Sequence, residues 1–216
     1  MTAAEAIDCD VLVIGGGPAG CTAAACLARL GRSVVLLERD RHPRFHIGES
    51  LLPANIPILE RLGVLEDVRK IGVLKLGADF PATNANGFNA FRFSGAMGST
   101  PDFAFQVKRE EFDQLLFRHA AALGVDARDG VRVRELDFSA LGVTAQADCD
   151  NGGRLAIRAR YLVDATGRDA LLGNRLGLRR KHPRHQSAAL FAHFRGVTRR
   201  TGEDAGNISK IGRAHV

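Results

Sequence analysis

Hydrophobic and polar positions fall in blocks along the chain, and these blocks predict both strands and helices. Residues 11–15 (VLVIG) and 33–38 (SVVLLE) are mostly continuous apolar runs, as is typical of strands buried on both faces of a parallel sheet. Between them, the residues from Pro18 to Leu30 are nearly all small or helix-forming, and Gly31 stands where a helix is expected to end. The order strand, helix, strand predicts a βαβ unit near the N-terminus.

Further blocks extend this pattern over the rest of the chain. Apolar residues at helical spacing between residues 54 and 72 predict one or two helices, because Gly63 interrupts them, and residues 108–123 predict another helix. The segment 73–107 is rich in Phe, Gly and Ser and predicts strands or hairpins. Strands are expected again over residues 131–136, 142–147, 154–159 and 161–167. These elements predict an α/β fold.

Composition and charge exclude several classes of protein. The 216 residues are 45% hydrophobic, enough for a domain with a core, and the formal net charge is +6. The basic stretches lack interleaved aromatic residues, so we expect a diffuse basic surface and no nucleic-acid partner. The four cysteines show no metal-ligand spacing, and neither a signal peptide nor a membrane span is apparent. We therefore expect no metal, no membrane partner and a cytoplasmic location.

A glycine motif between the first strand and the first helix points to a nucleotide. Gly15, Gly17 and Gly20 form G-x-G-x-x-G, and Glu38 ends the next strand. The first glycine permits a tight turn, the second lets the backbone approach a pyrophosphate, and the third lets helix and strand pack closely. The helix N-terminus attracts the anion, and the acid accepts hydrogen bonds from a ribose and disfavours a 2′-phosphate. The predicted site for a dinucleotide other than NADP also includes Pro18, Ala19 and Arg39.

Two later motifs carry a resemblance to a known class. Arg109, Phe112, Asp113 and Leu116 match R-x-x-F/L-D-x-x-L, and residues 164–167 read D-A-T-G. The chain thus resembles the flavoproteins that include the aromatic hydroxylases, geranylgeranyl reductases and flavin-dependent halogenases. This resemblance implies a Rossmann-like FAD-binding domain and FAD as the cofactor, with Arg109, Asp164 and Gly167 in its site. Val131 falls where the class pairs backbone with adenine, and an ordinary strand valine is the open alternative.

The stretch FHIGESLLP, residues 45–53, is too polar for a core segment. It is similar to the G-E-S loop of the flavin-dependent halogenases, which lies against the flavin. The resemblance therefore implies flavin contacts for Ile47, Gly48, Glu49 and Ser50. The alternative is a solvated start for a helix from Pro53 onward, with Ser50 as its N-cap.

Lys75 is the candidate catalytic residue. It lies in VLKLGADF, which resembles the K-x-G-A-x-F stretch of the halogenases. In those enzymes a flavin hydroperoxide oxidises halide to hypohalous acid, and the lysine carries or hydrogen-bonds this electrophile on its way to an electron-rich arene. A lysine suits this role because desolvation tunes its protonation state. The alternative is a strand lysine facing water, with Leu74 and Leu76 facing inward.

The resemblance also implies a division of the chain. We expect residues 7–72 and 105–180 to form a discontinuous FAD-binding domain, and residues 73–104 and 181–209 to form an inserted, incomplete substrate-side β-sheet. Residues 211–216 (IGRAHV) read as one frame of a sequencing adapter, so we hypothesise that native sequence stops near Ser209 or Lys210.

The function predicted is that of an N-terminal fragment of a flavin-dependent halogenase, because later motifs of the class, such as G-D-A and W-x-W-x-I-P, are absent. The resemblance implies an aromatic or carrier-bound substrate and a flavin reductase that supplies reduced FAD, and the fragment itself is expected to be inactive. Two alternatives stay open: a flavin-dependent monooxygenase or reductase of the same class, and a non-catalytic FAD-binding fragment.

Overall fold

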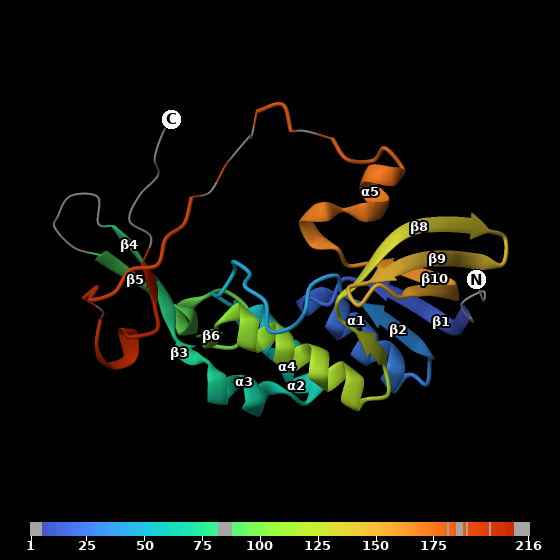
Figure 1. Cartoon of the computed structure of the whole chain (residues 1–216). Helices are drawn as coiled ribbons and strands as arrows, with labels where there is room; N and C mark the ends of the chain where they lie inside the picture. The colour runs from blue at the N-terminus through green and yellow to red at the C-terminus, as the bar shows by residue number, and fades with distance from the viewer. Residues whose placement is uncertain are drawn as a thin grey trace. The chain divides into compact units, whose positions relative to one another are not determined.

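The computed structural model describes residues 6–81, 88–180, 182–184, 188, 190–198 and 200–209 (Figure 1). The chain divides into two compact units, residues 1–46 with 110–183 and residues 47–109 with 184–216. Within the described ranges, no helix has the length and apolar character needed to cross a membrane. The adapter-like residues 211–216 lie outside the described residues.

The first unit is built on a six-stranded sheet in the order β7-β2-β1-β10-β9-β8. The first four strands of this order run parallel to one another, and β9 and β8 continue the sheet with antiparallel pairing. Its elements are β1 (Ala6–Ile14), α1 (Pro18–Arg29), β2 (Val34–Leu37), β7 (Asp126–Arg128), β8 (Val131–Ser139), β9 (Gly142–Cys149), β10 (Arg154–Asp164), η3 (Gly167–Asp169) and α5 (Leu171–Arg175). The predicted α/β class and the βαβ unit are confirmed.

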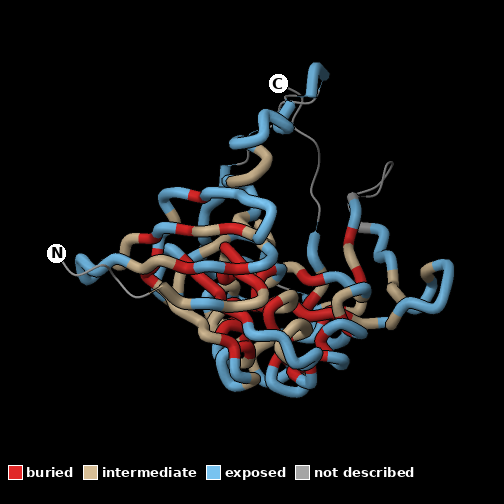
Figure 2. Tube along the Cα trace, turned by 90° about the vertical axis from the view of Figure 1, so that its right-hand side faces the viewer, coloured by how far each residue is buried: buried red, intermediate tan, exposed pale blue. Residues whose placement is uncertain are grey.

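The apolar runs form the core of this sheet. Leu12, Val35 and Ile157 are each at most 2% exposed, and Figure 2 shows buried residues along the strands. Because parallel strands in the centre of such a sheet are covered on both faces, their sequences read as unbroken apolar runs. The predicted strands 154–159 and 161–167 form one strand, β10. Its first half pairs with β9, while nearly its whole length pairs with β1.

The second unit contains short helices and small sheets. Gly63 adopts φ +74° and separates the two helices expected between residues 54 and 72. β3 pairs with β6, and β4 pairs with β5 and β11. The elements are η1 (Pro53–Asn55), α2 (Ile56–Leu62), α3 (Leu65–Ile71), β3 (Val73–Lys75), β4 (Gly77–Pro81), β5 (Phe88–Arg92), η2 (Phe93–Gly95), β6 (Ala104–Gln106), η4 (Gly202–Asp204) and β11 (Ile208–Ser209), and α4 (Arg109–Ala122) starts at the boundary between the units.

The packing units differ from the expected division of the chain. Residues 47–72 and 105–109 pack with the second unit, whereas the sequence suggested that they belong with the first. Backbone hydrogen bonds explain this, because Val107 N donates to Glu49 O at 2.9 Å and Leu51 N donates to Phe105 O at 3.0 Å. These bonds add the G-E-S loop to the edge of β6. Membership of these residues in a cofactor-binding domain stays a prediction.

Candidate functional site

The glycine motif of the first unit is shaped by two close approaches. Gly15 has φ +110°, and a Cβ there would lie 2.3 Å from the carbonyl oxygen of Ala165. A Cβ on Gly20 would lie 1.8 Å from the carbonyl oxygen of Gly15. Real Cβ atoms do not approach backbone so closely, so the tight turn and the close helix packing both require glycine. The turn and packing roles predicted for these two glycines are present.

Gly17 stands at a different kind of position. It is the N-cap of α1 with φ −80°, and a Cβ there would first meet Arg44 Nη2, at 3.6 Å. The fold itself therefore tolerates a side chain at this residue. Pro18 and Ala19 open the 12-residue helix, whose first turn holds no acidic residue. The positive end of the helix dipole is thus unopposed by a first-turn acid, which fits the binding of a pyrophosphate.

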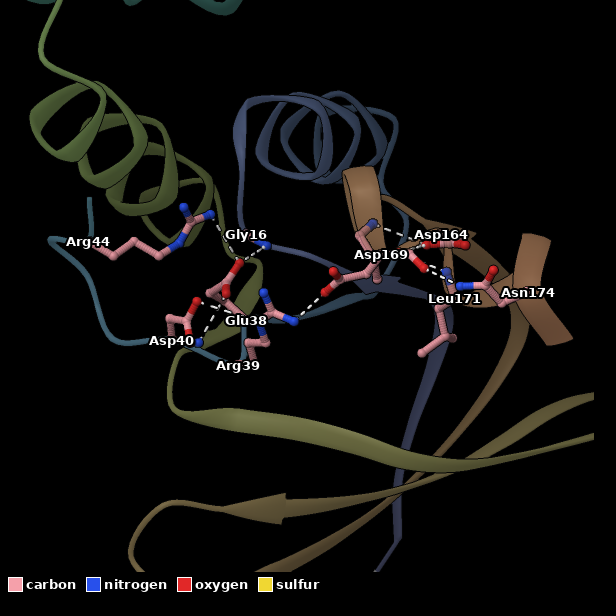
Figure 3. Close-up of polar contacts among 10 residues, drawn as sticks. Gly16, Glu38, Arg39, Asp40, Arg44, Asp164, Asp169, Leu171 and Asn174 are labelled. Carbon is pink, nitrogen blue, oxygen red and sulfur yellow. Dashed lines mark hydrogen bonds and ion pairs between the residues drawn. The ribbon is translucent and has the colours of Figure 1, made fainter. Parts of the chain in front are cut away.

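Glu38 is held firmly at the end of β2. It is only 5% exposed, and its Oε2 accepts a hydrogen bond from Gly16 N at 2.6 Å (Figure 3). Oε1 accepts one from Asp40 N at 3.0 Å. A Cβ on Gly16 would stand 2.7 Å from the Cβ of Glu38, so the residue between the first two motif glycines must also be small. Sequence reasoning missed Gly16, although three consecutive glycines were the available signal.

Arg44 was also missed. Its Nη2 lies 3.3 Å from Glu38 Oε2, and its Nη1 lies 3.4 Å from Oδ2 of Asp113, a residue of the R-x-x-F-D motif. Asp113 is fully buried and the side chain of Arg44 is 14% exposed. One guanidinium thus joins two buried carboxylates, that of Glu38 directly after β2 and that of Asp113 on α4. No local pattern distinguishes Arg44 from the other arginines of RDRHPR, because the contact spans 69 positions of chain.

The D-A-T-G turn is built around the carboxylate of Asp164. Oδ1 accepts hydrogen bonds from Thr166 N at 3.1 Å and Thr166 Oγ1 at 2.6 Å, and Oδ2 accepts one from Leu172 N at 2.8 Å. Burial opposes the charge, but these hydrogen bonds outweigh burial and lower the pKa of Asp164. Gly167 has φ +63°. The carboxylate therefore organises the start of the segment from η3 to α5, and its contact with a cofactor stays a prediction.

Two further predicted residues lie close to this turn or to Glu38. Arg39 forms an ion pair with Asp169 (Figure 3). Val131 has a side chain 5% exposed in the core of the sheet, and its N–H donates to Glu38 O at 2.8 Å. The side chain of Val131 is thus that of an ordinary strand valine, and only a backbone contact with adenine remains as a prediction.

The G-E-S loop of the second unit is fixed by Arg109. Its Nη1 donates to Ile47 O at 2.9 Å, and a Cβ on Gly48, which has φ +120°, would stand 2.9 Å from the same nitrogen. Gly48 N donates to Glu49 Oε2 at 3.0 Å. The structure thus brings the arginine of the R-x-x-F-D motif against the loop, and these were the two elements of this unit that the resemblance assigned to FAD.

Ser50 does not cap the following helical turn. Leu52 is the N-cap of η1, and Asn55 Oδ1 accepts the hydrogen bond from Leu52 N at 2.9 Å. The N-cap interpretation of Ser50 is therefore wrong. Asn55 supplies the capping oxygen from within the turn, and Ser50 Oγ instead accepts a hydrogen bond from Lys75 Nζ at 2.8 Å.

Lys75 is buried, with 2% of its surface exposed. Its Nζ donates to Ser50 Oγ and, at 2.7 Å, to Leu51 O, and it lies 5.2 Å from the ring centroid of Phe93. The alternative of a lysine facing water with Leu74 facing inward is wrong, because the side chain of Lys75 is buried and Leu74 is 45% exposed. Burial lowers the pKa of Lys75, and no carboxylate among the described residues forms an ion pair with it. The two segments that carried the halogenase resemblance are thus in direct contact.

The family model described as "FAD binding domain" matches residues 8–205. The chain belongs to the FAD-binding domain family. FAD is accordingly its cofactor, as the sequence motifs predicted, and the open helix N-terminus at Gly17 is consistent with this assignment.

Within this FAD-binding family, the chain is similar to proteins that are named as halogenases. The chain is 36% identical over 212 residues to the 1H-pyrrole-2-carbonyl-(peptidyl-carrier protein) chlorinase of Pseudomonas fluorescens, covering 90% of this chain and 47% of that protein. It is 41% identical over 187 residues to the flavin-dependent halogenase armH3 of Armillaria mellea, covering 81% of this chain and 35% of that protein. The resemblance to the flavin-dependent halogenases is confirmed.

A solved structure agrees with the fold. The myxobacterial chondrochloren halogenase CndH superposes with a TM-score of 0.69 at 35% identity, covering 74% of this chain and 38% of that one. This FAD-binding chain therefore spans about half or less of the length of the halogenases it matches.

Proposed function

We propose that the protein containing this chain is a flavin-dependent halogenase in which Lys75 is the catalytic residue. The observation that carries the proposal is the buried Lys75 side chain, hydrogen-bonded to Ser50 and Leu51 of the G-E-S loop. A lysine ammonium with no paired carboxylate costs stability when it is buried, so its retention here favours a chemical role. The similarity to named halogenases supports the same conclusion.

In this proposal, some residues of the chain bind FAD and Lys75 acts on the halogen. Gly15, Gly17 and the N-terminus of α1 would hold the pyrophosphate of FAD, and Arg109 holds the G-E-S loop in place. FAD, when reduced and bound, supplies the O2 chemistry that converts halide to hypohalous acid. Lys75 then receives this acid, either through a hydrogen bond or by forming a nitrogen–halogen bond with release of water.

Transfer of the halogen completes the reaction. In the covalent form, the arene takes the halogen from the Lys75 nitrogen and gives up a proton, and the amine is regenerated. Because burial lowers the pKa of Lys75, loss of a proton to give the neutral amine, whose lone pair attacks the halogen, costs less free energy than it would in water. Burial of the amino group keeps bulk water away from the electrophile.

Substrate and partner follow from the same chemistry. An electrophilic halogen requires an electron-rich aromatic substrate, free or carried on a protein, and a flavin reductase is required to supply reduced FAD. The chlorinase of Pseudomonas fluorescens bears the name of a carrier-bound pyrrole substrate, which supports the carrier-bound form. A cytoplasmic location stays a prediction.

The test uses the complete gene product with a flavin reductase, FAD and either chloride or bromide. Lys75→Ala is expected to keep FAD binding and O2 consumption while halogenated product falls by roughly 100-fold or more, because the electrophile is no longer positioned. Lys70→Ala is the matched control, since Lys70 lies on the surface and pairs with Asp67.

Mass spectrometry of the product decides the outcome. Halogenation by Lys75→Ala at the rate of the unmodified enzyme would reject the role of Lys75. Addition of oxygen by the unmodified enzyme, with halide ignored, would replace the halogenase by a flavin-dependent monooxygenase.

A further inference from the structure

The contact between Lys75 and the G-E-S loop depends on three chain segments. Lys75 ends β3, which pairs with β6 so that Lys75 lies opposite Ala104. On the other edge of β6, Ser50 forms an isolated antiparallel bridge with Gln106. Hydrogen bonds from Val107 N to Glu49 O and from Leu51 N to Phe105 O flank this bridge. Hydrogen bonds of the residues before and after Ser50 therefore hold its backbone in place, and this fixes the point from which the hydroxyl group extends.

We propose that Ser50 is a positioning residue for Lys75: its hydroxyl and the Leu51 carbonyl together orient the Lys75 amino group. The amino nitrogen has three positions beyond its bond to Cε. Two of them are occupied by N–H groups that donate to Ser50 Oγ at 2.8 Å and Leu51 O at 2.7 Å. The third position is then defined by tetrahedral geometry.

This third position serves both protonation states of the amine. In the ammonium it carries the remaining N–H, which can hydrogen-bond a reactant oxygen. In the neutral amine it carries the lone pair, which can attack an electrophile, while both N–H groups keep their acceptors. The two oxygens thus aim the reactive position without blocking it, and a single acceptor would leave the amino group free to rotate.

A carboxylate in place of Ser50 would act differently. It would favour the ammonium and hold the proton that must leave before the lone pair is available. The serine hydroxyl is a neutral acceptor, and burial is the one cause of the lowered pKa of Lys75, with no contribution from a neighbouring charge among the described residues. The catalytic meaning of this inference rests on the proposed function, whereas the contact itself does not.

The first experiment measures Lys75 directly by NMR on the chain labelled with ¹³C in its lysines. The chain has only five lysines, so the Cε signals are few, and Lys75→Met identifies the signal of Lys75. The signal is followed against pH in the unmodified chain, in Ser50→Ala and in Ser50→Thr, which keeps a hydroxyl. Ser139→Ala, which removes an exposed serine hydroxyl elsewhere, is the matched control.

Three results are expected from this titration. In the unmodified chain the two Cε protons of Lys75 have separate shifts, because the side chain is held in one conformation. In Ser50→Ala the pKa of Lys75 falls further, because the ammonium loses an acceptor, and the two Cε proton shifts merge. Ser50→Thr and Ser139→Ala keep both properties. Unchanged Lys75 signals in Ser50→Ala, or loss of both properties in Ser50→Thr despite unchanged signals from the other lysines, would overturn the proposal.

The second experiment connects the contact to activity in the complete gene product. Halogenated product is measured per O2 consumed by the FAD-loaded enzyme, and this ratio is expected to fall about tenfold in Ser50→Ala and to be mostly restored in Ser50→Thr. Full halogenation by Ser50→Ala would contradict a positioning role. If the unmodified enzyme makes no halogenated product, the proposed function fails, and the NMR titration still decides whether Ser50 orients Lys75.

Discussion

Gly20 packs so closely against Gly15 that a Cβ on Gly20 would lie 1.8 Å from the Gly15 carbonyl oxygen. The backbone of Gly15 cannot move away from Gly20, because it already lies close to the backbone of Ala165. The third glycine of the motif therefore has a packing role that is independent of the cofactor.

Gly20→Ala is expected to destabilise the fold by about 3 kcal/mol or more, because α1 must move away from the turn. Urea unfolding followed by circular dichroism measures this change. Gly173→Ala is the control, because among the described residues a Cβ at this position of α5 would meet just the Cβ of Ala170, the N-cap of that helix, at 3.4 Å. A loss below about 1 kcal/mol in Gly20→Ala would show that the turn relaxes more easily than this packing implies.

Gly17→Val separates folding from cofactor binding. A side chain at this N-cap first meets the end of the Arg44 side chain at 3.6 Å, so the free energy of unfolding should change by less than about 1 kcal/mol. The valine occupies the space through which a pyrophosphate approaches the helix N-terminus, so FAD affinity should fall at least about 100-fold. Titration of the complete gene product with FAD, followed by flavin fluorescence, provides the measurement. An unchanged affinity for FAD would show that the pyrophosphate does not bind next to Gly17.

Arg44→Met tests the cluster that fixes Glu38. Removing the guanidinium leaves the buried carboxylates of Glu38 and Asp113 without it, and the expected loss is roughly 3 kcal/mol of unfolding free energy. Arg41→Met is the control, because the side chain of Arg41 is largely exposed and solvent screens its ion pairs. Equal effects of the two substitutions in urea unfolding would mean that the buried cluster contributes no more than a surface pair.

Lys75→Met tests whether the buried lysine costs stability. At pH 7 the variant should be more stable than the unmodified chain by about 1 kcal/mol, as is common when a functional group is replaced by an apolar one. The pKa of Lys75 is lower in the folded chain than in the unfolded chain. At a pH between these two pKa values the unfolded chain holds a proton on Lys75 that the folded chain has lost, and at lower pH this preference for the proton stabilises the unfolded state. The stability advantage of Lys75→Met should therefore shrink as the pH rises toward 10.5, the ordinary pKa of a lysine.

Urea unfolding of both chains at pH 7 and pH 9.5 checks this expectation. Lys70→Met, at an exposed lysine, should show no comparable pH dependence. A difference between Lys75→Met and the unmodified chain that stays constant with pH would mean that the amino group is as well solvated in the folded state as in the unfolded one.

The sequence by itself determined the βαβ unit, the helix after Lys108 and the glycine turn of a dinucleotide site. These features rest on local physics, because an apolar run, a helical repeat or a glycine turn needs only neighbouring residues to be specified. Gly15 and Gly20 illustrate this, since both their spacing and their type follow from one strand–turn–helix segment. The break between the two helices at Gly63 was likewise visible in the order of residues.

Only the tertiary structure decided where Ser50, Lys75 and Arg44 act. Ser50 and Lys75 are 25 positions apart and meet because both segments bind to β6, a pairing that no local pattern specifies. Local reasoning therefore left open a helix cap for Ser50 and a water-facing position for Lys75, and the long-range contacts rule out both alternatives. Arg44 reaches Asp113 in the same non-local way. Burial and long-range hydrogen bonds give these side chains their roles, because both depend on how distant segments fold together.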